Sequence, residues 1–215
     1  MADVVLKGMT EAGLNVAIVS RTQSKLDAVA AKHPGNVKGF GFDLSNTAGM
    51  KALLESIAAD MGPIKVIYYN AVKFALPYNA PAEDVISGVN INFASLWASF
   101  GAVIDSWESS GGVFLMSGGG LAANGAYSVG FGAQFGAIQK SIMKNFVEGA
   151  SATYGEKGVH VCALEINALV FGGDNIGDEY NQDPGKSAAF AEILKGAVKS
   201  ALMDQTGNHY VIVAP

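Results

Sequence analysis

Short apolar runs alternate with longer amphipathic stretches along the whole chain. The apolar runs are continuous, as strands buried on both faces require, and they predict strands over residues 15–20, 37–42, 64–69, 112–116, 159–164 and 209–213. The stretches between them carry apolar residues at helical spacing and predict helices over residues 3–12, 22–32, 46–61, 82–109, 132–154 and 186–203. This alternation is typical of an α/β fold with a parallel sheet covered on both faces.

Composition narrows the class of protein. With 215 residues, half of them hydrophobic and 15% charged, the chain is expected to form one globular domain over residues 1–215. A formal net charge of −5 argues against nucleic acid or an anionic membrane as partner, and no apolar run is long enough to span a bilayer. The lone Cys162 and the lack of a secretory signal favour a cytoplasmic location. The three histidines are scattered, so no metal site is expected.

Sheets of this kind bind ligands beyond the carboxyl ends of their strands, so chemistry is expected in the loops that follow the strands. Read in order, these loops resemble the short-chain dehydrogenase/reductase family. The likeness rests on five segments: VSRTQSKLDAVA, which contains Ser20 and Arg21; Asp43-Leu44; Tyr69-Asn70-Ala71-Val72; GVFLMS, which ends at Ser117; and GEKGVHVCALEINALV. The resemblance implies a Rossmann-like, doubly wound sheet in three α/β/α layers. It also implies an oxidoreductase that moves hydride between NADP(H) and a small carbonyl or alcohol substrate.

The cofactor contacts that the resemblance implies are Ser20, Arg21, Asp43, Leu44, Asn70, Ala71 and Lys140. Arg21 replaces the acidic residue that would bind the ribose hydroxyl of NAD, and a guanidinium suits a 2′-phosphate, so NADP is the expected cofactor. Two alternatives stay open. Arg21 can be a solvated arginine at a helix start, and Asp43 can be a helix N-cap together with Ser45 and Asn46.

The catalytic residues that the resemblance implies are Ser117, Lys140 and Asn92, with Asn90 as a near competitor of Asn92. The family places a tyrosine four residues before its lysine, which is Gly136 here. Tyr127 is the candidate replacement, brought back towards Ser117 by a glycine-rich loop. Lys140 can also belong to a solvated helix face with Lys144, and Ser117 can be a turn cap. Tyr69 and Lys73 also spell Y-x-x-x-K, but after a strand, which indicates a chance match.

The resemblance implies a first strand and a glycine-rich phosphate loop ahead of residue 3, and this sequence contains neither. That strand would lie centrally, so residues 15–20 and 64–69 are expected to face an open slot. They can pair directly or take in another segment or chain, or the sequence is incomplete. An open edge invites association, so a homodimer or homotetramer is expected. The helices around Asn92 and Lys140 would form its surface, with small residues such as Gly136, Ala137, Gly149 and Ala150 allowing close approach.

The missing loop and the missing tyrosine also support a second hypothesis. The chain can be a binding or assembly protein on the same fold that has lost its cofactor, because a fold alone does not decide function.

Overall fold

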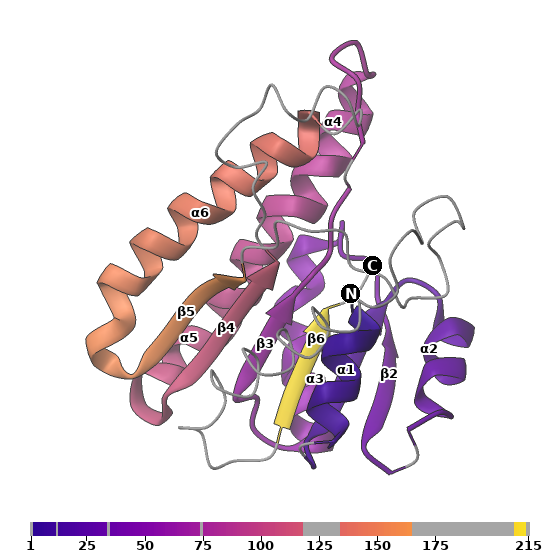
Figure 1. Cartoon of the computed structure of the whole chain (residues 1–215), viewed down its shortest axis with the longest axis vertical. Helices are drawn as coiled ribbons and strands as arrows, with labels where there is room; N and C mark the ends of the chain where they lie inside the picture. The colour runs from indigo at the N-terminus through magenta and orange to yellow at the C-terminus, as the bar shows by residue number, and fades with distance from the viewer. Residues whose placement is uncertain are drawn as a thin grey trace, which may run out of the picture.

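A parallel sheet of six strands forms the centre of the molecule (Figure 1). The computed structural model describes residues 2–11, 13–33, 35–73, 75–117, 134–164 and 209–213. The strand order is β2-β1-β6-β3-β4-β5, and every pairing is parallel. The strands are β1 (Asn15–Ser20), β2 (Val37–Gly41), β3 (Val66–Tyr69), β4 (Gly112–Ser117), β5 (Val159–Leu164) and β6 (His209–Val213). The sequence predicts all six, with the same bounds for β1, β5 and β6.

Successive side chains of each strand point to opposite faces of the sheet. Both faces are apolar, and helices cover each of them. On one face, Val16, Ile18 and Tyr68 pack with residues of α1 (Ala2–Glu11) and α2 (Gln23–Ala30). On the other, Ala17 and Tyr69 belong to a larger cluster with α3 (Met50–Met61), α5 (Ser95–Ser110) and α6 (Gln134–Tyr154). The fold is therefore a three-layer α/β/α sandwich. None of the helices in the described ranges is long and apolar enough to cross a membrane.

The predicted helix over residues 82–109 is three segments. α4 (Ala82–Val89) leads into a π-helical turn, η2 (Asn90–Ala94), and α5 follows directly. In that turn the Ser95 backbone N–H donates to the carbonyl of Asn90, five residues back. The predicted helix over 46–61 also begins differently, as a 3₁₀ turn, η1 (Thr47–Gly49), ahead of α3. The predicted helix over 186–203 lies outside the described residues.

The expected open slot in the sheet is filled by β6. Asn15 of β1 pairs with His209, and Val66 of β3 pairs with Tyr210, so β6 bonds to both strands that would face the slot. Of the possibilities that the sequence leaves open, another segment of the same chain takes the central place. The expectation of an exposed central edge is therefore wrong, and an oligomer needs a different physical reason.

The buried indole of Trp107 packs directly against the backbone of Gly112. Trp107 is fully buried on α5, and its Nε1 donates to the carbonyl of Ile64 at 2.7 Å. A Cβ added to Gly112, the first residue of β4, would lie 2.1 Å from the indole. The residue at 112 must therefore lack a side chain for Trp107 to keep this position.

We expect Gly112→Ala to lower the free energy of unfolding by about 2 kcal/mol or more, because the indole has to leave its hydrogen bond and its packing. Gly101→Ala is the matched control: Gly101 lies within α5 with no atom within 4 Å of an added Cβ. It should gain about 0.5–1 kcal/mol through helix propensity. Urea unfolding of both variants checks this, and equal midpoints would contradict it.

Candidate active site

Three polar side chains meet at the carboxyl ends of β3 and β4. Because Tyr69 pairs with Met116, Tyr68, Asn70 and Ser117 point to the same face of the sheet. The Ser117 hydroxyl donates to Asn70 Oδ1 at 2.5 Å and lies 2.6 Å from the Tyr68 hydroxyl. Tyr68 also reaches Asn70 Oδ1 at 3.2 Å. The three groups form a closed triangle, with Ser117 only 4% exposed.

Lys140 joins this cluster from α6. Its Nζ donates to the backbone carbonyl of Ser117. Burial lowers the pKa of Lys140 to about 8, because an ammonium loses hydration there. Lys144, one turn further along α6, is exposed. Lys140 is therefore not part of a solvated helix face, and α6 brings it to the serine as the sequence resemblance implies.

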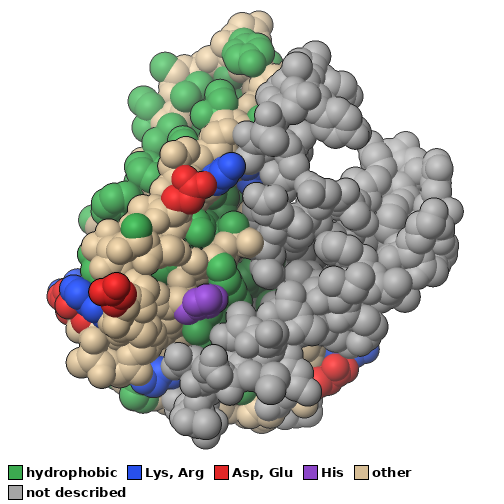
Figure 2. Space-filling model, turned by 60° about the vertical axis from the view of Figure 1, so that its left-hand side comes forward, with side chains coloured by type: hydrophobic (Ala, Val, Ile, Leu, Met, Phe, Trp, Pro, Cys, Tyr) green, Lys and Arg blue, Asp and Glu red, His purple; other side chains and the backbone are tan. Residues whose placement is uncertain are grey.

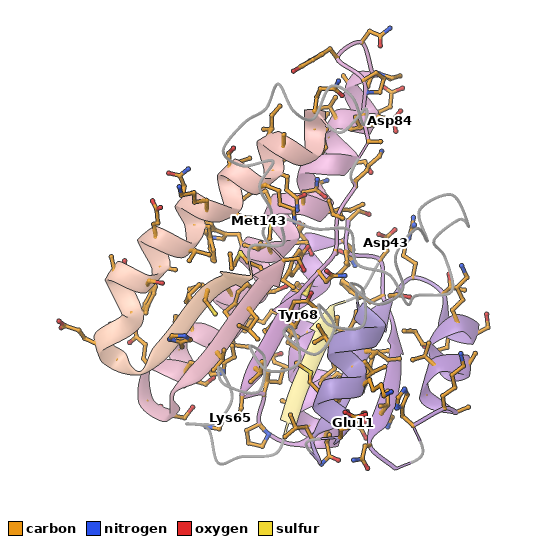
Figure 3. All side chains as sticks on the ribbon, in the orientation of Figure 1. Glu11, Asp43, Lys65, Tyr68, Asp84 and Met143 are labelled. Atoms are coloured by element: carbon orange, nitrogen blue, oxygen red, sulfur yellow. The ribbon has the colours of Figure 1, made fainter. Side chains whose placement is uncertain are left out.

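The expected tyrosine position holds no hydroxyl. Gly136 is buried on α6, and the neighbouring Phe135 ring packs against Gly88 of α4, where an added Cβ would lie 2.6 Å from the ring. Tyr127, the candidate replacement, lies outside the described residues. The phenol that does touch Ser117 is Tyr68, which the sequence reasoning missed. It is fully buried within β3 (Figure 3), and burial raises its pKa to about 12.

Asn92 holds the backbone of the segment that follows β3. Its Oδ1 accepts the backbone N–H of Lys73 at 2.6 Å, and its Nδ2 donates to the Lys73 carbonyl at 3.0 Å. Asn92 is 2% exposed, so its amide is committed to this backbone rather than presented to solvent. The side chain of Lys73 turns outward and pairs with Asp84 at 2.8 Å.

Tyr69, the strand neighbour of Tyr68, faces the opposite helix layer. Its hydroxyl donates to the carbonyl of Ile91, inside the π-helical turn η2. With Lys73 paired to Asp84, the Y-x-x-x-K spelled by Tyr69 and Lys73 holds no coupled pair, as expected from the sequence.

A second group of polar residues lies at the ends of β1 and β2. Arg21 follows β1 directly and is exposed. Asp43 Oδ1 accepts the backbone N–H and the hydroxyl of Ser45, both at 2.9 Å, and these bonds, aided by the charge of Arg21, lower the pKa of Asp43. Asp43 therefore caps a turn, whereas Asn46 caps η1 by accepting from Gly49 N. Of the three residues offered as the helix cap, Asn46 is the N-cap, whereas Asp43 and Ser45 are not.

Gln23, the first residue of α2, holds the end of β2 through a hydrogen bond to the backbone. Its Oε1 accepts the backbone N–H of Gly41 at 2.8 Å, and its Nε2 donates to Asp27 at 2.7 Å. The remaining cofactor candidates are buried: Ser20 is 9%, Leu44 6% and Ala71 2% exposed. The side chains of Leu44 and Ala71 belong to the core, so any contact they make with a ligand has to come from the backbone.

The family model for short chain dehydrogenases matches residues 3–169. The chain belongs to the short-chain dehydrogenase family. No curated protein matches it. With a glycine at position 136 instead of a tyrosine, it is an atypical member of this family of oxidoreductases.

Solved structures share the fold at low identity. An alcohol dehydrogenase from the archaeon Thermococcus sibiricus, complexed with 5-hydroxy-NADP, has a TM-score of 0.73 and 16% identity over 98% of this chain and 90% of that one. A gluconate 5-dehydrogenase from Burkholderia cenocepacia, complexed with NADP and tartrate, gives 0.73 and 18% over 98% and 88%. A 3-ketoacyl-(acyl-carrier-protein) reductase from Brucella melitensis, complexed with NADH, gives 0.73 and 15% over 98% and 91%.

Proposed function

We propose that this chain, folded as one domain, is an NADP(H)-dependent oxidoreductase that interconverts a small carbonyl compound and its alcohol. The observation that carries the proposal is the convergence of Lys140, Ser117 and Asn70 at one point on the carboxyl edge of the sheet. Arg21 and Asp43 lie at the same edge, just after β1 and just beyond β2. Two of the solved relatives named above are complexes with NADP or an NADP derivative.

The residues at this edge fit the two ends of the cofactor. Arg21 is exposed, and its charge acts on Asp43 and would serve a 2′-phosphate in the same way. Lys140 donates to a backbone carbonyl, so its ammonium can also serve the hydroxyls of a ribose. α1 runs into β1 from the carboxyl edge, so its first backbone N–H groups point towards the region between these two ends (Figure 1).

NADP(H) would supply or accept the hydride, and the protein would supply position and hydrogen bonds. The proton of the alcohol would come from or go to Tyr127 or water, because Gly136 carries no acid. Ser117 would turn its hydroxyl to the carbonyl oxygen of the substrate and stabilise the negative charge that develops there. Lys140 would hold the cofactor ribose. Asn92 would keep the loop after β3 in place through the Lys73 backbone, which acts on the site only indirectly.

The test is a fluorescence titration of the purified chain with NADPH and NADH. We expect Arg21→Ala to weaken NADPH binding about tenfold to a hundredfold and to leave NADH binding unchanged, because charge-assisted hydrogen bonds contribute about 1.5–3 kcal/mol. Lys25→Ala, which removes an exposed charge from the same helix start, is the control. No binding of NADPH at millimolar concentration would end the proposal. Oxidation of NADPH with a panel of small aldehydes and ketones then tests turnover.

Gly136 favours a second candidate function. Without a hydroxyl at this buried position, the chain can bind the dinucleotide without catalysis, as a sensing or assembly module. Tight NADPH binding with no turnover across the panel would support this candidate over the oxidoreductase.

We also propose that two copies associate through an uncharged groove lined by residues of η2, α5 and α6. Trp97 is 59% and Ile138 53% exposed, and they line a groove of about 510 Å³ with Phe93, Ser141, Ile142, Asn145 and Phe146. Hydrophobic side chains gather along the upper part of the described surface (Figure 2). Helices of 16 and 21 residues, about 24 and 31 Å long, offer the roughly 600 Å² per partner that a small specific interface needs.

The interface expected from the sequence relied on an open sheet edge and on small helical residues, and the structure changes both points. The central sheet edge is closed by β6. Of the small residues expected at the interface, Gly136, Ala137 and Ala150 are buried within the chain, whereas Gly149 is exposed. The three buried residues pack within their own chain, and Gly149 is the one that leaves space for a neighbouring helix.

A further inference from the structure

The hydroxyl of Tyr68 lies within reach of both of its neighbours in the triangle. It is 2.6 Å from Ser117 Oγ and 3.2 Å from Asn70 Oδ1. Asn70 Oδ1 has no hydrogen and can only accept, and at 2.5 Å it takes the Ser117 hydrogen. The hydrogen of Tyr68 then points to Ser117 Oγ. In this arrangement the serine hydrogen is committed to Asn70 and not available to another oxygen.

A serine that serves a carbonyl oxygen must give up its bond to Asn70. That would leave a partly buried amide oxygen short of a donor, which is unfavourable in a low-dielectric site. A small rotation of the Tyr68 hydroxyl replaces the lost donor, because the phenol oxygen already lies 3.2 Å from Asn70 Oδ1. Burial raises the pKa of Tyr68 to about 12, so the phenol keeps its hydrogen at neutral pH.

We propose that Tyr68 is a positioning residue, a switchable hydrogen-bond donor that frees Ser117 to bind a carbonyl oxygen. The role rests on the proposed function for its reaction, but the switch itself is a property of the three side chains. Tyr68 is fully buried, so it would act through Ser117 rather than by contact with a substrate. No covalent bond is made or broken in the switch. The Tyr68 hydroxyl only changes its hydrogen-bond acceptor, from Ser117 Oγ to Asn70 Oδ1.

Ser117→Ala tests the switch without any substrate. Removal of the serine hydroxyl takes one donor from Asn70, and we expect a crystal structure of this variant to show the Tyr68 to Asn70 separation shortened from 3.2 Å to about 2.7 Å. A separation that stays at its present value or increases would overturn the proposal, whether or not the protein is an enzyme.

Tyr68→Phe and Tyr69→Phe form a matched pair for the reaction. Each removes one hydroxyl from a fully buried ring of β3, and only Tyr68 touches Ser117. With NADPH and the most reactive ketone of the panel, Tyr68→Phe should lower kcat/KM about tenfold and leave the NADPH Kd unchanged, whereas Tyr69→Phe should change kcat/KM little. Equal losses in the two variants would contradict the inference. If the wild type turns over no ketone, the proposed function fails, and the Ser117→Ala structure still decides the switch.

Discussion

Lys140→Met is expected to make the protein more stable and inactive. Burial lowers the pKa of Lys140 to about 8 from 10.5, so the folded state binds the proton less tightly than the unfolded state. Below pH 8 both states are protonated, and the native state carries the full desolvation cost. Stability therefore rises with pH between about 8 and 10.5, by up to roughly 3 kcal/mol. Methionine keeps most of the volume and removes the charge, so this slope should disappear.

At pH 7 we expect Lys140→Met to gain about 2 kcal/mol in the free energy of unfolding, after the loss of the bond to the Ser117 carbonyl. Turnover should fall at least about a hundredfold, because the ribose and the serine lose their cation. Lys144→Met, the exposed neighbour on α6, should change neither quantity. Urea unfolding at pH 7, 8, 9 and 10 checks this, and a slope that is the same in both variants would contradict it.

Trp97→Asp is expected to turn a dimer into a monomer. The indole lies at the centre of the uncharged groove, with its ring 5.8 Å from that of Phe93 and 5.6 Å from that of Phe146. A buried tryptophan commonly contributes 2 kcal/mol or more to an interface, and a two-fold contact uses it twice. The dimer Kd should therefore increase about a hundredfold or more. Trp97 is 59% exposed in the single chain, so the fold should survive.

Sedimentation velocity over a range of concentrations measures this effect. Tyr78→Asp is the control, since Tyr78 is 85% exposed and does not line the groove. A wild type that is monomeric at all concentrations, or a Trp97→Asp variant that stays dimeric, would reject the interface.

The sequence predicts what depends on local pattern. Strand positions follow from continuous apolar runs, and the meeting of Asn70 and Ser117 follows because parallel strands end at the same edge of a sheet. The four-residue spacing from Lys140 puts Gly136 where the family has its tyrosine, and this position is buried on α6. The π-helical turn is different. It forms where Tyr69 and Lys73 contact Ile91 and Asn92, and no periodicity in residues 82–109 reports those distant bonds.

Tyr68 could have been found from the sequence. Two consecutive tyrosines in a doubly buried strand each need a hydrogen-bond partner, and the serine at the end of the next strand is an obvious one. The placement of β6 could not, because an apolar strand of five residues pairs equally well at the edge or in the centre. The position of β6 is decided by the place left open between β1 and β3.

The position of β6 governs the order in which the sheet can be completed. β2 and β1 form one half, and β3, β4 and β5 form the other; β6 alone joins them. During synthesis β6 leaves the ribosome after the five other strands. The edges of β1 and β3 that face each other therefore stay unpaired until β6 can bond to both. Contacts this distant in sequence form slowly. Until β6 is made, the two half-sheets therefore expose backbone donors and acceptors to any competing strand.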